Sequence, residues 1–294
     1  MTFDEYQVRA KETDQVPGEG HDQKIVPLLG LAGEAGQLLS EYKKHLRDGD
    51  AHRLFNERVA EELGDLLWYV STVATKFGLH LDDVAAGNIR KTHARWGHKA
   101  RSATLDLFRF FDDEYSDAER LPRYFEVQIS DTIENGSVKM RAFINGKQVG
   151  DPLTDNAHSS DGYRFHDIFH FGFAAGLGWS PVTRKNLGCK RKSNPKADEV
   201  EDGGRATAIE EGLSAIIFDY AKQHQFLEGI KALDYDLLKL IKSNTESLEV
   251  GRRSVGDWEK TIINAYEVWR EVTRSKGGTV IVDLENRRLT YRAA

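Results

Sequence analysis

The sequence predicts a mainly α-helical protein in which an all-helical N-terminal domain is followed by an α+β domain. Over the first hundred residues, apolar side chains recur at intervals of three and four, which is the period of an amphipathic helix. After about Leu121 the pattern changes to alternating polar and apolar residues separated by turn sequences, which is typical of strands. These patterns indicate a helical domain at 1–100, a connecting region at 101–121 and a second domain at 122–294.

Four helices are expected in the N-terminal domain. Their approximate ranges are 4–13, 25–46, 53–77 and 81–96. Pro17 and Gly18 break the chain before the second helix, which is placed so that Pro27 falls in its first turn, where a missing N–H is tolerated. Gly78 ends the third helix. One face of that helix is apolar over its whole length, with Val59, Leu63, Leu66, Val70 and Val73 at spacings of three and four.

The second domain should combine hairpins with helices. Strands are expected at 124–129, 138–144, 279–284 and 288–291. Asn145-Gly146 is a further hairpin-type turn. Helical patterns cover 163–176, 207–223, 235–243 and 255–273. Strands and helices that are grouped in this way predict an α+β fold.

The composition restricts the class of protein. A hydrophobic fraction of 39% and a charged fraction of 30% are typical of a soluble globular chain, and no apolar run reaches the length that spans a membrane. The net charge of −6 makes a nucleic-acid partner unfavourable. Cys189 is the one cysteine, so no intrachain disulfide can form, which agrees with a cytoplasmic location.

Two acidic clusters in the helical domain indicate phosphate chemistry. Glu34, Gln37 and Glu41 share one face of the second helix, and Glu62 and Asp65 share a face of the third. If the two helices are antiparallel neighbours, the clusters face each other. Carboxylates inside apolar stretches need a compensating charge. Mg²⁺ would supply it, because this cation prefers carboxylate oxygens combined with substrate phosphates.

Each cluster also contains a glycine. Gly36 and Gly64 should each cost about 1 kcal/mol relative to alanine inside a helix. We therefore expect them either to let the two helix backbones approach closely or to leave space beside a ligand.

The residues around these clusters resemble the MazG family of all-α nucleoside triphosphate pyrophosphohydrolases. The resemblance covers about residues 25–96 and is carried by Leu31-Ala32-Gly33-Glu34-Ala35-Gly36-Gln37, Glu61-Glu62-Leu63-Gly64-Asp65-Leu66-Leu67-Trp68-Tyr69 and Asn88-Ile89-Arg90-Lys91. It implies a four-helix module, usually oligomeric, that uses Mg²⁺, or Mn²⁺ in its place, to hydrolyse ribo- or deoxyribonucleoside triphosphates to monophosphate and pyrophosphate. The metal ligands of the family form an ExxE…ExxD pattern, and the corresponding positions here are Glu34, Gln37, Glu62 and Asp65.

Gln37 departs from that pattern. Its amide oxygen can contact a cation but supplies no negative charge. Glu41 lies one turn further along the helix and could provide the missing carboxylate. If it does not, the site holds fewer metal ions or holds them weakly. A nucleotide-binding regulator with a weakened metal site is then the alternative to an enzyme.

Basic and polar side chains near the clusters are candidates for binding the triphosphate. The resemblance supports a substrate role for Asn88 and Lys91 in the fourth helix, and Arg95 shares their face. Three further cations follow the first cluster, namely Lys43, Lys44 and Arg47. For these three and for Arg95, an ordinary solvent-facing charge is an equally good explanation.

Two further expectations concern catalysis and assembly. Glu61, next to the second cluster, is a candidate general base for the attacking water. One four-helix module buries little surface by itself, so we expect a homodimer in which helices of both copies form each site.

His166 and His170 are the best candidates for chemistry in the second domain. They lie four residues apart on one helix face and could bind a transition metal, which would make this domain a metal-dependent hydrolase. Glu210 and Glu211 could join them in space. The spacing resembles that of H-E-x-x-H metalloproteases, but Asp167 stands where the glutamate would be. A hydrogen-bonded structural pair is the more common explanation for such histidines.

Overall fold

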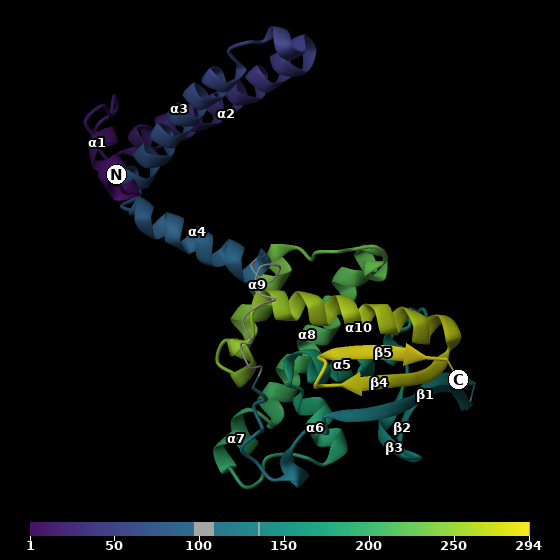
Figure 1. Ribbon diagram of the computed structural model, residues 1–294. Helices are drawn as coiled ribbons and strands as arrows, with labels where there is room; N and C mark the ends of the chain where they lie inside the picture. The colour runs from purple at the N-terminus through teal and green to yellow at the C-terminus, as the bar shows by residue number, and fades with distance from the viewer. Residues whose placement is uncertain (97–108, 135, 294) are drawn as a thin grey trace. The chain divides into compact units, whose positions relative to one another are not determined.

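The computed structural model describes residues 1–96, 109–134 and 136–293, without the side chains of 94–96. Contacts between residues gather into two compact units, 1–93 and 94–294. Figure 1 shows that the N-terminal unit consists of helices and that the C-terminal unit combines a sheet with helices. None of the described helices is both long and apolar enough to cross a membrane.

Four α-helices make up the N-terminal unit. They are α1 (Phe3–Lys11), α2 (His21–Asp48), α3 (Phe55–Lys76) and α4 (Leu81–Trp96). α2 and α3 form a long antiparallel hairpin through the 3₁₀ turn η1 (Gly49–Ala51), and α1 packs on α3 (Figure 1). α4 is tied to α1 by hydrogen bonds, since the Phe3 N–H donates to Asp82 and the Leu81 N–H donates to Gln7, both at 3.0 Å.

As far as residues 1–96 are described, the four helices of one chain do not close into a four-helix bundle. Among the described residues, none of the extensive helix–helix contacts involves α4. The buried aliphatic side chains described in this unit are those of Ala10, Pro27, Ala74 and Leu81. On α2, by contrast, Leu29, Leu39 and Leu46 are 67%, 70% and 70% exposed. The hairpin therefore leaves apolar surface uncovered, which is characteristic of an interaction surface.

The C-terminal unit contains a five-stranded antiparallel sheet in the order β3-β2-β1-β4-β5. The strands are β1 (Tyr124–Glu134), β2 (Ser137–Ile144), β3 (Lys147–Leu153), β4 (Gly277–Asp283) and β5 (Arg288–Arg292). β1 is the central strand, and its register places Val127 opposite Val280 and Ile129 opposite Gly278. Phe125, Val127 and Ile129 are buried and alternate with more exposed neighbours, so one face of the sheet is covered.

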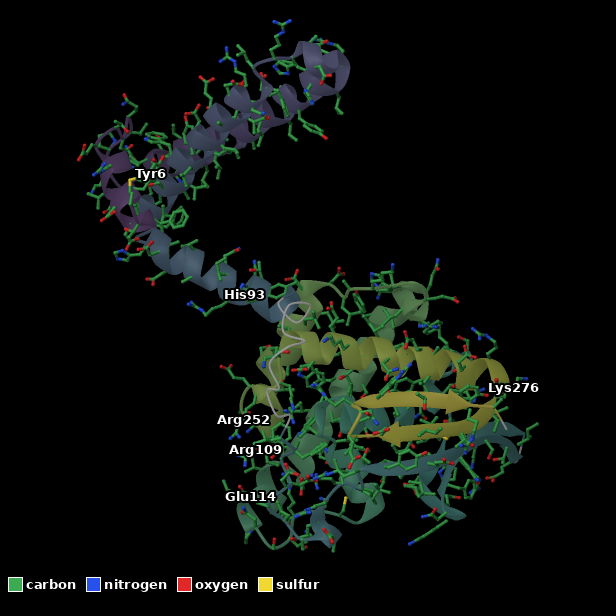
Figure 2. The ribbon with its side chains drawn as sticks, in the orientation of Figure 1. Tyr6, His93, Arg109, Glu114, Arg252 and Lys276 are labelled. Atoms are coloured by element: carbon green, nitrogen blue, oxygen red, sulfur yellow. The ribbon has the colours of Figure 1, made fainter. Side chains whose placement is uncertain are left out.

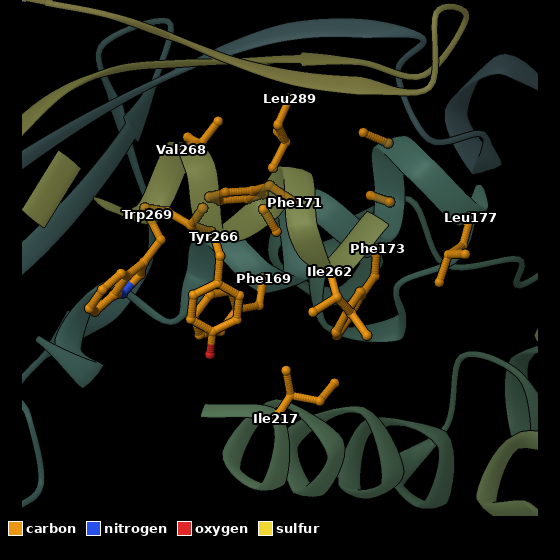
Figure 3. Close-up of a cluster of buried hydrophobic side chains, with 14 of the residues drawn as sticks. Phe169, Phe171, Phe173, Leu177, Ile217, Ile262, Tyr266, Val268, Trp269 and Leu289 are labelled. Atoms are coloured by element: carbon orange, nitrogen blue, oxygen red, sulfur yellow. The ribbon is translucent and has the colours of Figure 1, made fainter. Parts of the chain in front are cut away.

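Helices cover that face in layers. α5 (Asp167–Leu177) and α10 (Val255–Ser275) contact β4 and β5, and α8 (Gly204–Gln223) contacts α5. Figure 3 shows Leu289 of β5 on one side of this core, Phe169 and Ile262 in the middle, and Ile217 of α8 on the other side. The remaining elements are α6 (Pro181–Leu187), α7 (Pro195–Val200), α9 (Tyr235–Thr245) and the 3₁₀ turns η3 (Asp117–Glu119), η4 (Tyr163–Phe165), η5 (Gln225–Leu227) and η6 (Glu249–Arg252).

α5 and α10 approach each other closely where α5 carries glycine. A Cβ atom at Gly172 would lie 2.8 Å from the Ala265 side chain, and one at Gly176 would lie 2.1 Å from Thr261 Oγ1. No side chain fits at either distance, so the two glycines set the separation of the helices that cover the sheet.

Residues 109–121, within the range expected to connect two domains, pack as part of the C-terminal unit. Leu121 belongs to its hydrophobic core, and Asp112 is completely buried. The Asp112 carboxylate accepts hydrogen bonds from Arg184 Nη2 at 2.6 Å, from Arg123 Nη2 at 2.7 Å and from the Leu121 N–H at 2.8 Å. This segment is therefore anchored by a buried, fully paired charge.

Candidate metal and substrate site

The α2–α3 hairpin brings three carboxylates together. Glu34 comes from α2, and Glu62 and Asp65 come from α3, where a spacing of three residues places them on one face. One oxygen of each carboxylate lies within 4.8 Å of the other two. Glu34 and Glu62 are half-buried, whereas Asp65 is exposed. We call these three residues the carboxylate cluster.

The electrostatics of the carboxylate cluster favour a bound cation. Burial raises the pKa of Glu62, and the charges of Glu34 and Asp65 raise it further. Such a set of oxygen donors fits a hard divalent cation such as Mg²⁺ or Mn²⁺, because these ions are held by carboxylates. A cation at this point would remove the repulsion that the three carboxylates exert on one another.

Tyr6 of α1 is a neighbour of the cluster that the sequence patterns did not indicate. Burial, followed by the charge of Asp65, raises the pKa of the Tyr6 phenol. Figure 2 labels Tyr6 on α1, near the base of the hairpin. The packing of α1 on α3 places this residue there, and the spacing of residues within α3 gives no sign of it.

Gln37 and Glu41 occupy different environments. Gln37 is exposed, whereas Glu41 is buried and pairs with Lys44 and with His52, whose Nε2 lies 3.4 Å from Glu41 Oε2. The hydrogen bond from Lys44 is the main cause that lowers the pKa of Glu41. Glu41 lies outside the group of three converging oxygens, but its charge contributes to the raised pKa of Glu62. Glu41 therefore acts on the cluster through its charge without being one of the three converging carboxylates.

This arrangement gives a prediction for the two residues. Glu41→Gln should lower metal-dependent activity about 10- to 100-fold, the usual effect of losing a residue that supports metal ligands. Gln37→Ala should change activity less than twofold, because surface changes are usually near neutral. Rates of pyrophosphate release, measured for both variants at saturating Mg²⁺, test this. A larger loss in Gln37→Ala than in Glu41→Gln would show that the amide, not Glu41, serves the site.

The predicted substrate-binding residues are spread over the unit. Lys44 is engaged by Glu41, and Arg47 pairs with Asp48, while Lys43 is exposed. Asn88 and Lys91 are exposed on α4, and the described residues show no extensive contact between α4 and the hairpin that carries the carboxylate cluster. The side chain of Arg95 lies outside the described residues.

Glu61, the candidate general base, is on the solvent side of α3. Its side chain is 58% exposed, and its Oε2 accepts a hydrogen bond from Arg58 Nη1 at 2.7 Å. The charge of Glu61 also contributes, less than those of Glu34 and Asp65, to the raised pKa of Glu62. Glu61 is thus adjacent to the cluster without belonging to its three converging oxygens.

The close helix approach expected at Gly36 and Gly64 occurs elsewhere. Apart from the adjacent residues and the backbone of its own helix, a Cβ atom at either position would meet no described atom within 4 Å. A Cβ atom at Gly30, however, would lie 2.2 Å from the ring of Tyr69, so this glycine allows α2 and α3 to pack around the tyrosine. The expectation of close backbone approach at Gly36 and Gly64 is therefore wrong within one chain. The open space at both residues is compatible with the other explanation, that the two glycines leave room beside a ligand.

The aromatic residues beside the cluster have structural contacts. Trp68 Nε1 donates to Thr13 Oγ1 at 2.8 Å, and its ring meets that of Tyr69 edge-on at 4.9 Å. These contacts hold the segment before α2 against α3, so the two aromatic side chains have a structural role.

The described residues contain a second group of side chains that could hold a metal ion. It consists of His166 and His170, at the start of α5, and Glu211 of α8. The sequence pattern had indicated the two histidines, but only the packing of α8 on α5 brings the carboxylate to them.

Known protein families match both parts of the chain. Residues 27–100 match the MazG nucleotide pyrophosphohydrolase domain, and residues 106–294 match the MazG C-terminal domain. The N-terminal part is similar to the Gene 37 protein of Mycobacterium phage L5, with 37% identity over 101 residues that cover 32% of this chain and 89% of the phage protein. No solved structure matches the chain significantly. The first match includes all three residues of the carboxylate cluster.

Proposed function

The chain belongs to the MazG family, and from this premise we propose that its helical unit hydrolyses nucleoside triphosphates to monophosphate and pyrophosphate with Mg²⁺ as cofactor. Its MazG nucleotide pyrophosphohydrolase domain makes it a hydrolase that acts on phosphoanhydride bonds. The convergence of Glu34, Glu62 and Asp65 carries the proposal of a metal-dependent site, because three oxygen donors within 4.8 Å suit a hard cation.

The cluster would hold Mg²⁺, or Mn²⁺ in its place, which supplies charge neutralisation for the triphosphate and for the pyrophosphate that leaves. The chain's own part is to hold the three carboxylates in place on two helices that pack around Tyr69. Glu61, with Oε2 fixed by Arg58, would accept the proton of the attacking water through its other oxygen. Asn88 and Lys91 would bind phosphate oxygens that the cation leaves free.

A homodimer would complete this site. The hairpin exposes apolar side chains on α2, and in the part of the chain that the structure describes α4 makes no extensive contact with this hairpin. In a dimer, α4 of one copy could lie along the hairpin of the other and bring Asn88 and Lys91 to the partner's carboxylates. Analytical ultracentrifugation of the full chain tests this, since a monomer at micromolar concentration would contradict it.

The experiment that tests the function is a panel of ribo- and deoxyribonucleoside triphosphates assayed for pyrophosphate release with and without Mg²⁺. We expect release that requires the cation and that differs between bases and sugars. The second candidate, a nucleotide-binding regulator, is favoured by one observation, the uncharged Gln37 at a ligand position of the family pattern. Saturable nucleotide binding without turnover across the whole panel would select the regulator.

A further inference from the structure

We propose that the C-terminal unit carries a site for a divalent transition-metal ion of the Zn²⁺ type, formed by His166, His170 and Glu211. The site is separate from the carboxylate cluster, and the proposed hydrolysis does not use it. His166 immediately precedes α5, His170 lies one turn further along in that helix, and Glu211 belongs to α8. One ligand atom from each residue lies within 4.8 Å of the other two, as required for a shared ion.

Both imidazole rings are oriented so that the same nitrogen faces Glu211. Glu211 Oε2 lies 3.8 Å from His166 Nε2 and 3.4 Å from His170 Nε2. His166 Nδ1 lies 2.9 Å from the carbonyl oxygen of Tyr163, which can only accept, so Nδ1 carries the proton. This leaves the lone pair of His166 on Nε2, the atom that faces the proposed ion.

A buried glutamate orients the second ring in the same way. His170 Nδ1 lies 2.9 Å from Glu210 Oε1. Glu210 is completely buried and also accepts hydrogen bonds from the Ser180 hydroxyl at 2.6 Å and from the Val182 N–H at 2.9 Å. A metal-ligating histidine almost always donates its other ring N–H to a carboxylate, a backbone carbonyl or a water, and His170 and His166 show the first two of these arrangements.

His170 Nε2 is the second, independent indication of a ligand. The His170 side chain is 1% exposed, and its Nε2 has no hydrogen-bond partner among the described residues. A buried polar nitrogen without a partner is costly. Glu211 Oε2, although within ion-pair distance, does not meet hydrogen-bond geometry with it. An ion between Nε2 and this carboxylate would satisfy both groups.

The competing explanation is that a proton, not a metal, occupies this place. Burial alone would lower the pKa of His170, but the charge and hydrogen bond of Glu210, together with the nearby Glu211 carboxylate, raise it to about 10. His170 would then be an imidazolium held between two glutamates. That explanation accounts for His170, but it gives no role to the matching orientation of His166. Measured metal binding separates the two.

The donor set defines the class of ion. Two imidazole nitrogens and one carboxylate oxygen suit Zn²⁺ and neighbouring transition metals, whereas Mg²⁺ and Ca²⁺ prefer oxygen ligands alone. The side chain of Glu211 is 44% exposed, so an ion can reach the site from solvent, and a water can complete its coordination. Such an ion would join α5 to α8 beside the hydrophobic core.

The test uses the full chain, stripped of metal and then dialysed against Zn²⁺ with excess Mg²⁺ to occupy the carboxylate cluster. We expect one Zn²⁺ per chain by metal analysis, and a rise in melting temperature. His166→Ala and Glu211→Gln should each weaken Zn²⁺ binding at least about tenfold. Glu211→Gln is the safer variant for folding, because its side chain is partly exposed.

His224→Ala is the matched control. His224 also has its Nδ1 against a backbone carbonyl, that of Tyr220 at 2.7 Å, but it is not part of a metal-capable group among the described residues. It should retain Zn²⁺, as should Glu62→Gln. Equal Zn²⁺ content in all variants, or none in the unmutated chain, would overturn the proposal. Mg²⁺-dependent pyrophosphate release should persist in Glu211→Gln, so the result is independent of the proposed hydrolysis.

Discussion

Glu62→Gln and Asp65→Asn should each reduce Mg²⁺-dependent pyrophosphate release by at least about 100-fold. Substituting a residue that only supports a metal ligand already lowers activity about 10- to 100-fold, and these two residues are the proposed ligands themselves. Both substitutions remove a negative charge from the carboxylate cluster but preserve side-chain size. They also relieve the repulsion that contributes to the raised pKa of Glu62, so the helices should stay folded without the cation.

Two measurements separate loss of the metal from loss of the fold. Mg²⁺ should raise the melting temperature of the unmutated protein and should not do so for either variant, because ligand binding stabilises only a chain that binds it. Glu57→Gln is the matched control, since Glu57 is an exposed residue in the first turn of the same helix and should remain fully active. Full activity in Glu62→Gln or Asp65→Asn would remove that residue from the metal ligands.

Arg184→Met should lower the free energy of unfolding of the C-terminal unit by about 3–5 kcal/mol, the usual cost of removing one partner from a buried ion pair. Arg184 and Asp112 are both almost fully buried, and Arg184 also donates to the carbonyl oxygens of Glu119 and Cys189 at 2.9 and 3.2 Å. The substitution leaves these groups with fewer donors. Urea unfolding followed by tryptophan fluorescence measures the loss, since Trp179, Trp258 and Trp269 are buried in this unit.

A surface ion pair in the same unit provides the comparison. Arg274→Met removes an exposed pair with Glu271, made at 2.9 Å, and should cost less than about 1 kcal/mol. If Arg184→Met costs no more than Arg274→Met, the buried pair does not hold residues 109–121 to the unit.

The pH dependence of stability follows from the same carboxylate. Burial alone would raise the pKa of Asp112, but the hydrogen bond from Arg123 and the charge of Arg184 outweigh it and lower the pKa below the ordinary value of 3.8. A carboxylate with a lowered pKa stabilises the fold above its unfolded-state pKa. This contribution is lost as the pH falls from about 4 through the lowered folded-state value. Asp112→Asn should therefore flatten the acid limb of the stability curve.

Periodicity predicted the long elements well, because each of them buries one face. The fourth helix was expected at 81–96 and is α4 (Leu81–Trp96), and the alternation after Leu121 corresponds to β1 and β2. The predicted start of α2, at about residue 25, was wrong. The helix begins at His21, so Pro27 lies inside it and not in its first turn. Proline is tolerated best in the first turn of a helix, but here the helix continues through Pro27.

Three short elements were not predicted, for identifiable reasons. β3 contains Gly150 and Pro152, which weaken a strand signal, and it lies at an edge of the sheet, where proline is tolerated. α6 and α7 are only 7 and 6 residues long, too short to show periodicity. A cap signal was nevertheless present, because Ser180 and Asn194 each cap a helix whose first residue is proline.

For the site, too, the sequence predicts the contacts that depend on local spacing and not those that depend on tertiary packing. Helical spacing placed Glu62 and Asp65 on one face of α3, and a hairpin then suffices to bring Glu34 to them. The pairing of Glu41 with His52 depends on how η1 folds the chain back, so that His52 lies against α2. No spacing rule reports such contacts, because they arise from tertiary packing. That the cluster binds metal stays a prediction from the sequence.

The position of β1 at the centre of the sheet has a consequence for how the protein is made. β1 follows the helical unit closely along the chain, but its partner β4 is separated from it by helices α5 to α10. During synthesis the ribosome therefore releases the helical unit, and then β1 to β3, well before β4 and β5 exist. Contacts between such distant segments form slowly. Until then one edge of β1 is unpaired, and the face that carries Phe125, Val127 and Ile129 is not yet covered by the complete core. Unpaired edges and uncovered apolar side chains of nascent chains promote aggregation and are the surfaces that chaperones bind.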